Sequence, residues 1–518
     1  MKVVTAAEMR ELERRAAERG IPSPVLMEHA GLAVALEVKR WLGGAAGRQV
    51  IVLVGPGNNG GDGLVAARHL HDWGARVHVC LCSEREGDAN YDIVRARAIP
   101  CTFVGAEGGL AALGGLLAAG DVVIDSLFGT GRLRPLEGVL REVLVKVREA
   151  RTARPALGVV AVDVPSGLDA DSGAIDPASA PADITITLGY PKVGLFAFPG
   201  RGLVGELVVA DIGIPDELGA DIVTGLIDEY YVNSMLPRRP LDAHKGTNGR
   251  VLVCAGSGNY IGAAYLACEA ALRVGAGLVT LAVARSLQPV LAAKLTEATY
   301  APLAESEPGF IAAEAAGQLH EWLATYDVLL IGCGLGQHPS VASFVARSLL
   351  EMPPSLDVRV IIDADALNAL AQIPQWWQRM ERDAVLTPHP GEMARLTTLP
   401  VGGMAQERPK VARQAAQDWH KTVVLKGAHT VVASPDGAAM ISPFANPGLA
   451  SAGTGDVLAG AIAGLAAQGL PPAAAAACGV YLHGAAGEVV KCELGDAGMV
   501  ASDLLPVLPT VIKSIKGG

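Results

Sequence analysis

The first half of the chain carries apolar residues first at helical spacing and then in short unbroken runs. These spacings predict a helix over residues 6–19 and an amphipathic helix over 23–41. A β-branched run predicts a buried strand at 50–54, followed by a helix over 64–73. Further strands are predicted at 77–82, 122–125, 159–163 and 184–188, with helical stretches between several of them. This succession predicts a doubly wound parallel sheet.

The second half repeats this rhythm without repeating the sequence. A proline-punctuated segment, 236–240, predicts a linker, and residues 221–231 before it can already belong to the second half. From residue 243 onward, strands are predicted at 251–254, 278–283, 328–331, 358–363, 385–387 and 423–426. We therefore expect two different α/β domains, residues 1–218 and 224–518, and no duplication.

Composition and charge narrow the possible partners. The 42 basic and 53 acidic residues give a net charge of −11 without a Lys/Arg cluster, which excludes nucleic acid as an expected partner. The N-terminus has no apolar signal segment, and the apolar region 457–486 is interrupted by Gln468, two prolines and His483, so no membrane span is expected. Eight cysteines without a Cys-x-x-Cys spacing indicate a reducing, cytoplasmic compartment and no zinc site.

A glycine-rich segment follows the predicted strand at 50–54, with the sequence Gly55-Pro-Gly-Asn-Asn-Gly-Gly-Asp62-Gly. Its glycines satisfy G-x-G-x-x-G, and Glu84 follows the next strand as a ribose-binding acid would, so a dinucleotide dehydrogenase is one interpretation. Asp62, however, places a negative charge where a pyrophosphate should lie. The segment therefore favours another polar ligand, together with a cation.

Oxygen-bearing side chains also follow other predicted strands. Asp125 begins Asp125-Ser-Leu-Phe-Gly-Thr-Gly131, and Asp163 and Ser166 lie in Asp163-Val-Pro-Ser166-Gly-Leu-Asp. Each residue alone is more simply a cap or turn residue. Since ligands of parallel sheets bind at the carboxyl edge, however, these three and Asn59 are expected to converge. Oxygen ligands of this kind suit a hard cation and not zinc.

These three motifs, in this order and spacing, resemble the NAD(P)H-hydrate epimerase family, also called the YjeF N-terminal domain, over residues 1–215. The resemblance implies interconversion of the two configurations at the hydroxylated C6 of damaged NADH or NADPH, with Asp163 as proton carrier. It also implies potassium coordination by Asn59, Asp125 and Ser166. The residues implied to surround the hydrated nucleotide are Asn58, Asn59, Gly60, Gly61, Asp62, Gly129, Thr130, Gly131, Arg132, Leu133, Arg134 and Pro135.

In the second half, Gly453-Thr-Gly-Asp456 precedes an Ala-rich helical run. Small residues at a helix start leave N–H groups that attract phosphate. Asp456 is then either a base for a hydroxyl that attacks this phosphate or a first-turn partner of the helix dipole. His389 lies between two prolines and is either a ligand-binding residue or a packed turn residue. Lys426 follows a predicted strand and either neutralises phosphate or reaches solvent. No G-x-x-x-x-G-K-[ST] motif is present.

This half resembles the ribokinase-like fold and, more narrowly, the NAD(P)H-hydrate dehydratase or YjeF C-terminal domain, through His244-Lys-Gly-x-x-Gly, Thr387-Pro-His-Pro-Gly-Glu, Lys426-Gly-x-x-Thr and Asn446-Pro-Gly-x-x-x-x-Gly-Thr-Gly-Asp. The resemblance implies that Asp456 deprotonates the C6 hydroxyl, that ADP is the phosphoryl donor and that magnesium offsets its charge. Residues implied to face the hydrated substrate are Ala263, Gly334, His389 and Asp456, and those implied to hold the nucleotide or the transferred phosphoryl group are Lys426, Gly427, Ala428, His429, Thr430, Gly453, Thr454 and Gly455.

The leading hypothesis is a bifunctional repair enzyme that epimerises both hydrates and dehydrates the S form, releasing AMP and phosphate. The alternative is a vitamin-type small-molecule kinase fused to a Rossmann-like binding module, because the same Gly-Thr-Gly-Asp chemistry phosphorylates stable alcohols. A third interpretation makes the first half a non-catalytic binding module. Small-molecule substrates and a homo-oligomeric state are expected.

Overall fold

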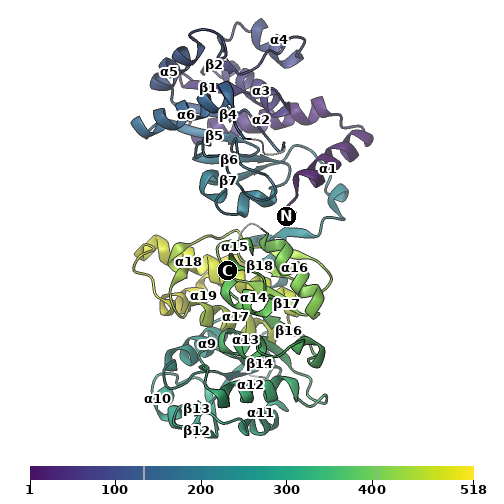
Figure 1. Cartoon of the computed structure of the whole chain (residues 1–518), viewed down its shortest axis with the longest axis vertical. Helices are drawn as coiled ribbons and strands as arrows, with labels where there is room; N and C mark the ends of the chain where they lie inside the picture. Colours follow the sequence, from purple (N-terminus) through teal and green to yellow (C-terminus); the bar gives the residue numbers. More distant parts are fainter. Residues whose placement is uncertain (132–134, 245, 405–406, 518) are drawn as a thin grey trace. The chain divides into compact units, whose positions relative to one another are not determined.

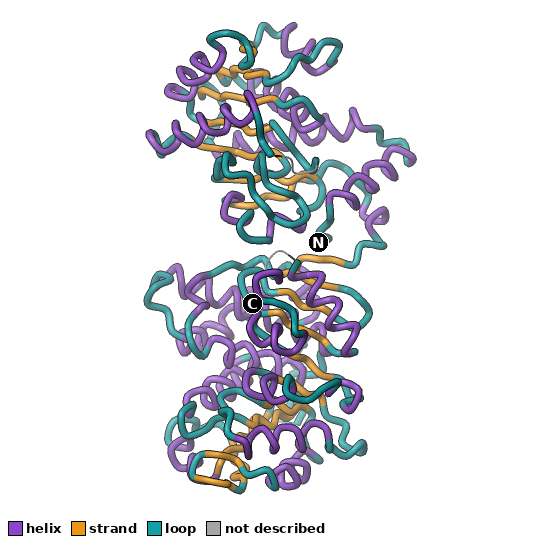
Figure 2. Tube along the Cα trace, viewed as in Figure 1, coloured by secondary structure: helices purple, strands orange, loops and turns teal. Residues whose placement is uncertain are grey.

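The chain folds into two compact units, Met1–Ile222 and Val223–Gly518. The structure, a computed structural model, describes residues 1–131, 135–244, 246–404 and 407–517. In both units the strands run through the interior and the helices surround them (Figure 2). The sequence-based expectation of two α/β units is confirmed.

The N-terminal unit is built on a parallel sheet of strand order β3-β2-β1-β4-β5-β6-β7. The strands are β1 (Gln49–Val54), β2 (Arg76–Leu81), β3 (Cys101–Phe103), β4 (Val122–Ser126), β5 (Gly158–Val162), β6 (Ile184–Leu188) and β7 (Glu206–Ala210). The helices are α1 (Ala6–Glu18), α2 (Ser23–Trp41), α3 (Asn58–Asp72), α4 (Ala89–Ala96), α5 (Gly109–Ala119), α6 (Gly138–Ala153) and α7 (Arg201–Val204). The strand order reverses between β1 and β4, which is where such sheets bind ligands.

Helices cover both faces of this sheet (Figure 1). Alternate residues of β1 point to opposite faces. Val50, Val52 and Val54 join the hydrophobic core formed with α2 and α3, whereas Ile51 and Leu53 join a second core formed with α5 and α6. Burial on both faces explains why the strands read as unbroken apolar runs in the sequence.

The C-terminal unit contains a larger mixed sheet of strand order β11-β10-β9-β14-β15-β16-β17-β18-β19-β8. Its strands are β8 (Thr224–Leu226), β9 (Arg250–Cys254), β10 (Leu278–Ala284), β11 (Thr299–Leu303), β14 (Val328–Ile331), β15 (Arg359–Ile362), β16 (Ala384–Leu386), β17 (Thr422–Leu425), β18 (Val431–Ala433) and β19 (Ala439–Ile441). The pairs β17–β18 and β18–β19 are antiparallel, whereas β19 and β8 pair in parallel. The strands β12 (Glu305–Glu307) and β13 (Phe310–Ile311) form a separate antiparallel pair.

Helices of this unit connect and cover the parallel strands. They are α8 (Glu229–Met235), α9 (Ile261–Arg273), α10 (Gln288–Ala292), α11 (Ala315–Leu323), α12 (Pro339–Leu350), α13 (Ala364–Leu370), α14 (Pro390–Thr397), α15 (Val401–Met404), α16 (Arg408–Trp419), α17 (Thr454–Ala467), α18 (Pro472–Leu494) and α19 (Ala501–Ile515). One of them, α18, is long and apolar enough to cross a membrane, but 72% of its most apolar window is buried inside the protein. It is therefore a core helix of this unit.

The strands that the sequence predicted are all present, but several others were missed. The missed strands β3, β7, β8, β11, β18 and β19 lie at or toward the edges of their sheets, where sequence patterns are weaker, and the short pair β12 and β13 was also missed. The turn between β18 and β19 contains Ser434-Pro-Asp-Gly437. This Pro-Asp-Gly signal could have identified the hairpin.

Candidate active sites

The N-terminal unit has a cleft of about 400 Å³ beside the carboxyl ends of its central strands. Segments from α1, α2 and α3 and from the loops after β4 and β5 form its walls. Of the residues expected around the hydrated nucleotide, those lining the cleft are Asn58, Asn59, Asp62, Gly129, Thr130 and Gly131, and Asp163 joins them. Pro135 is exposed and does not line it. Arg132, Leu133 and Arg134 lie outside the described residues.

The glycine-rich segment is the start of a helix and not a loop before one. Helix α3 begins at Asn58, so the predicted start at residue 64 is wrong. The glycines are needed for close packing, because a Cβ on Gly60 would lie 2.3 Å from the Gly55 carbonyl oxygen and one on Gly61 would lie 2.7 Å from the Met27 sulfur. The first turn of α3 therefore packs directly against its neighbours, which places Asn58, Asn59 and Asp62 on a rigid element.

An arginine occupies the region where a ribose-binding acid was considered. Glu84 is exposed, whereas Arg85 donates hydrogen bonds to the carbonyl oxygens of Gly55, at 2.5 Å, and Gly57, at 2.6 Å. Arg85 also pairs with Asp88. This arrangement ties down the turn before α3 and does not support the dinucleotide-dehydrogenase interpretation.

Three of the four oxygen-bearing residues expected to converge do meet in one network. Ser166 Oγ donates to Asp125 Oδ1 at 2.6 Å, and Ser166 N donates to Asp125 Oδ2 at 3.0 Å. Ser166 Oγ also accepts from Phe128 N, while Asn59 Nδ2 donates to Phe128 O at 2.8 Å. Burial raises the pKa of Asp125, and its bonds to Ser166 oppose that rise. This carboxylate is buried among neutral donors beside hydroxyl, amide and carbonyl oxygens, a ligand set that fits a hard cation.

Asp163 lies in the same cleft but has different partners. Its backbone φ is +67°, an unusual value for a residue other than glycine. The fully buried Lys192 forms an ion pair with its carboxylate, and Leu188 N donates to Asp163 Oδ1 at 3.1 Å. Lys192 was not among the residues expected from the sequence, although it follows the predicted strand at 184–188, where the same strand-end rule that identified the acids applies.

The C-terminal unit places Asp456 in the first turn of α17. Gly453 precedes this helix with φ +91°, which suits glycine. Small residues let α17 pack tightly against α9, because a Cβ on Gly460 would lie 2.1 Å from the Ala267 carbonyl oxygen. Burial, followed by the charge of Asp363, raises the pKa of Asp456 to about 7. A carboxyl group with this pKa can act as a base near neutral pH.

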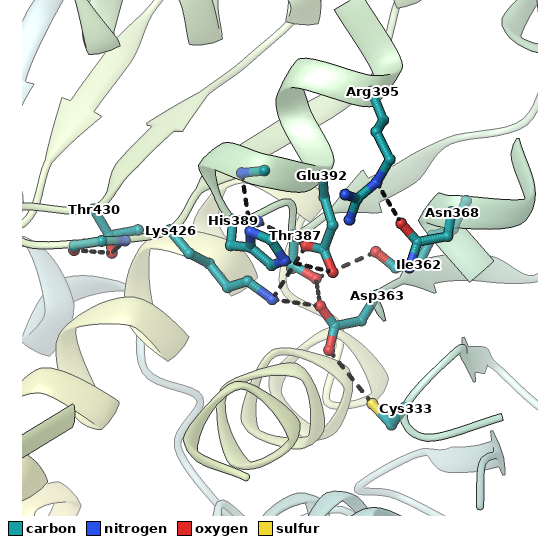
Figure 3. A network of polar contacts seen from close by, with 12 residues as sticks. Cys333, Ile362, Asp363, Asn368, Thr387, His389, Glu392, Arg395, Lys426 and Thr430 are labelled. Carbon is teal, nitrogen blue, oxygen red and sulfur yellow. Dashed lines mark hydrogen bonds and ion pairs between the residues drawn. The ribbon is translucent and has the colours of Figure 1, made fainter. Parts of the chain in front are cut away.

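Figure 3 shows a buried ion-pair network around Asp363. Asp363 and Asp456 offer ligand atoms within 4.8 Å of one another, so the network lies next to Asp456. Asp363 Oδ1 accepts from Thr387 Oγ1 at 2.6 Å and from Lys426 Nζ at 2.7 Å. Lys426 Nζ is also 3.8 Å from Glu392 Oε2. Burial alone would lower the pKa of Lys426, but the carboxylates of Asp363 and Glu392 raise it above its usual value. Lys426 therefore points into the protein, so its expected alternative of reaching solvent is wrong.

Cys333, Asp363 and Asp456 each offer an atom within 4.8 Å of the others. This cluster does not suit magnesium, because the Cys333 thiol is a soft ligand and Asp363 is already paired with Lys426. Cys333 Sγ instead lies 3.6 Å from Asp363 Oδ2 as a hydrogen-bond donor. The cluster is better described as a polar network that surrounds the Asp456 carboxyl group.

A pocket of about 180 Å³ adjoins the start of α17. Of the residues expected to hold nucleotide, those lining it are Lys426, Gly427, Ala428, Thr430, Thr454 and Gly455. His429 does not line it: it is buried, with Nδ1 2.9 Å from Ser442 O. Gly453 also lies outside the lining. The sequence analysis missed Phe444 and His483, which line the same pocket.

The residues expected to face the hydrated substrate fall into two groups. Gly334, with φ +62°, directly contacts Ala263, because an added Cβ would lie 2.7 Å from the Ala263 Cβ. Gly334 follows Cys333, which connects this pair to the Asp456 network. His389 caps α14, and its pKa is lowered by burial and then by the charge of Lys426. Lys245 of the His-Lys-Gly motif lies outside the described residues.

Comparisons with known proteins cover both units. A family model described as YjeF-related protein N-terminus matches residues 23–194, and one described as NAD(P)H-hydrate dehydratase matches residues 251–510. A bifunctional NAD(P)H-hydrate repair enzyme of Moorella thermoacetica is 44% identical over 525 residues, which cover 100% of this chain and 97% of that protein.

Solved structures resemble the C-terminal half. An ADP/ATP-dependent NAD(P)H-hydrate dehydratase from Bacillus subtilis, co-crystallised with ATP and Mg²⁺, is 35% identical; the match covers 56% of this chain and 98% of that chain, with a TM-score of 0.48. A ribokinase-like superfamily protein from Enterococcus faecalis is 27% identical; that match covers 57% of this chain and 97% of the other, with a TM-score of 0.49.

Proposed function

The chain belongs to the family of bifunctional NAD(P)H-hydrate repair enzymes, and from this premise we propose how its activities are divided between the two units. The protein epimerises hydrated NADH and NADPH at C6 and uses ADP to dehydrate the S form to NAD(P)H, with release of AMP and phosphate. We assign epimerisation to residues 1–218 and dehydration to residues 224–518. The vitamin-kinase alternative is not favoured, because the family relationship extends over the whole chain.

The observation that carries this division is that each unit has its own polar cleft with its own carboxyl group. Asp163 lines the N-terminal cleft beside Lys192. Asp456 has a pKa of about 7 and adjoins a separate pocket in the C-terminal unit. Two chemically different carboxyl sites are what two reactions on one damaged coenzyme require.

In the N-terminal unit, we assign the hydrated nicotinamide to the cleft lined by Asn58, Asp62 and Gly129, with Asp163 as a proton-carrying group. Potassium would be held by Asn59, Asp125 and Ser166. Bound there, it would offset the buried Asp125 carboxylate and fix the loop that follows β4. This assignment is supported by the hydrogen bonds that already join the three side chains to that loop.

In the C-terminal unit, Asp456 takes the proton of the C6 hydroxyl, whose oxygen then attacks the terminal phosphoryl group of ADP. Backbone N–H groups at Gly453, Thr454 and Gly455 stabilise the transferred phosphoryl group, since they open helix α17. The lone pair of the ring nitrogen then expels phosphate to form a C=N⁺ bond, and loss of a proton from C5 to solvent forms the C5=C6 bond and returns the electron pair to nitrogen, which restores the dihydronicotinamide. Lys426, Thr430 and their neighbours hold the nucleotide, and Ala263, Gly334 and His389 face the hydrated ring. Magnesium would be bound by the nucleotide phosphates and would offset their charge.

Two substitutions test the division in the full-length chain. With the purified S hydrate and ADP, we expect Asp456→Asn to abolish recovery of dihydronicotinamide absorbance while exchange between the hydrates persists. We expect Asp163→Asn to abolish exchange while dehydration of the S hydrate continues. Loss of both activities in either variant, with unchanged thermal unfolding, would refute two independent sites.

A cytoplasmic location and a homo-oligomeric state complete the proposal. The location is supported by the eight cysteines, all of which are free. The oligomer is supported by exposed apolar side chains near the start of the C-terminal unit, Tyr230 at 86% and Leu241 at 109% relative exposure. Sedimentation of the purified chain would test the oligomer.

A further inference from the structure

Three carboxyl groups, one lysine and the exposed Arg10 line the N-terminal cleft. The carboxyl groups belong to Glu13 of α1, Asp62 of α3 and Asp163 after β5, and the lysine is Lys192. Lys192 is completely buried and forms its ion pair with Asp163. Its Nζ also donates to the Leu188 carbonyl oxygen at 2.9 Å. The positive charge of Lys192 is therefore committed to Asp163.

Asp62 is in the opposite situation. Only 7% of the residue is exposed, and within the described ranges no hydrogen bond or ion pair reaches its carboxyl group. Burial raises the pKa of Asp62 well above its usual value; the charges of Asp163 and Glu13 add to this rise, while Lys192 and Arg85 oppose it. Arg85 is itself held by Gly55, Gly57 and Asp88. Asp62 therefore keeps its proton to a higher pH than an ordinary carboxyl group does.

We propose that Asp62 is the proton donor of the epimerisation and Asp163 the proton acceptor, with the two roles exchanged in the reverse direction. This inference rests on the proposed epimerase function and goes beyond it, because it gives Asp62 a chemical role in addition to lining the cleft. A buried carboxyl group without a charge partner, beside one that is paired with a lysine, gives two groups in different environments, which is the usual basis for dividing acid and base roles between two carboxyl groups.

The proton balance is complete within the cleft and solvent. The C6–O bond breaks as the ring nitrogen's lone pair forms a C=N⁺ bond, and the Asp62 proton leaves with the hydroxide as water. Water then adds to C6 from the other face of the ring, and the electron pair of the C=N⁺ bond returns to nitrogen. The proton lost by the added water goes to the Asp163 carboxylate. Exchange with solvent then returns Asp62 to its protonated form and Asp163 to its ionised form.

The decisive experiment compares Asp62→Asn with Glu13→Gln in the full-length chain, starting from the purified R hydrate without ADP. Glu13 is the competing acid to exclude, because it lines the same cleft and its pKa is also raised, by desolvation and then by the charge of Asp163, although the residue is more exposed than Asp62. We expect Asp62→Asn to lower the kcat of epimer exchange by about 100-fold or more, the range for loss of a general acid, with little change in KM. Glu13→Gln should lower kcat much less than Asp62→Asn does, because the more exposed Glu13 carboxyl group meets solvent, which can replace it as a proton source.

Two further measurements separate catalysis from folding or binding. The wild-type rate should fall on the alkaline side as Asp62 loses its proton, and the residual rate of Asp62→Asn should lack this limb. Exchange in H₂¹⁸O should place the heavy isotope at the C6 hydroxyl, because the proposed step releases water. Thermal unfolding, together with dehydration of the S hydrate with ADP, shows whether the Asp62→Asn chain is intact.

Several outcomes would overturn the inference: full kcat in Asp62→Asn, a change in KM alone, an equal loss in Glu13→Gln, or exchange of epimers without incorporation of ¹⁸O. If the wild type itself does not exchange the hydrates faster than buffer, the epimerase function fails and the inference fails with it. If the wild type exchanges the hydrates and Asp62→Asn exchanges them equally fast, only the role of Asp62 is refuted.

Discussion

The charge of Asp363 should set the pH range in which the dehydratase works. Asp456 must be ionised to act as a base, so activity should rise with pH through its pKa of about 7. Asp363→Asn removes a negative charge next to Asp456 but keeps the size of the side chain. Because the repulsion disappears, the pKa of Asp456 should fall, and the acidic limb of the rate profile should move to lower pH.

The size of this shift follows from the geometry. The nearest ligand atoms of Asp363 and Asp456 are no more than 4.8 Å apart. Two unit charges at that distance interact by about 3.5 kcal/mol at an effective dielectric constant of about 20, which corresponds to about 2.5 pKa units. Asp456 is only partly buried, so solvent screens some of this interaction. We therefore expect the limb to move by about 1 to 2 pH units.

The assay follows dihydronicotinamide absorbance from the S hydrate and ADP between about pH 5 and pH 9, with kcat/KM determined at each pH. Asp365→Asn is a graded control, because Asp365 contributes least among the groups that shift the pKa of Asp456. It should move the limb less than Asp363→Asn does. Circular dichroism at each pH identifies unfolding. An unmoved limb, or one that moves to higher pH in a folded Asp363→Asn protein, would refute the electrostatic reasoning.

Two other predictions concern packing and potassium. Gly460→Ala should lower the free energy of unfolding of the C-terminal unit by about 1–3 kcal/mol in urea titrations, because its Cβ would lie 2.1 Å from the Ala267 carbonyl oxygen. Gly317→Ala, where nothing lies within 4 Å, is the control and should be neutral or stabilising; equal stability of the two variants would contradict this. Ser166→Ala should weaken the activation of epimer exchange by KCl over NaCl about tenfold or more, without affecting dehydration. An unchanged response to potassium would remove Ser166 from the proposed cation site.

The sequence predicted the central strands well because burial on both faces leaves unbroken apolar runs, as in β1 and β14. The sequence also predicted that Asn59, Asp125 and Ser166 lie close together, because the carboxyl ends of parallel strands share one edge of the sheet. It failed at the start of α3, where glycines that suggest a loop instead permit contacts that a Cβ would prevent. Glycine-rich segments occur both in loops and in tightly packed helices, and the two cases can be distinguished only by the atoms that surround the glycines.

Charge partnerships were the other feature that the sequence did not reveal. Lys192 with Asp163 and Lys426 with Asp363 each join residues far apart in the chain. The protonation of Asp62 and Asp456 depends on these pairings and on burial, neither of which a local pattern encodes. The motifs therefore predicted which residues lie together, whereas the structure was needed to infer which of their carboxyl groups keep a proton.

The pairing of β8 with β19 has a consequence for synthesis on the ribosome. Thr224 of β8 lies directly after the N-terminal unit, yet its partner is Ala439, near the end of the sheet-forming sequence. By the time β8 emerges, every strand of the N-terminal sheet has already been made. The N-terminal unit can therefore fold while translation continues, whereas the first strand of the C-terminal unit must wait for β19, the last strand of that unit. Of the strands in the larger sheet, the edge strand β8 is therefore synthesised first, but its partner β19 is synthesised last.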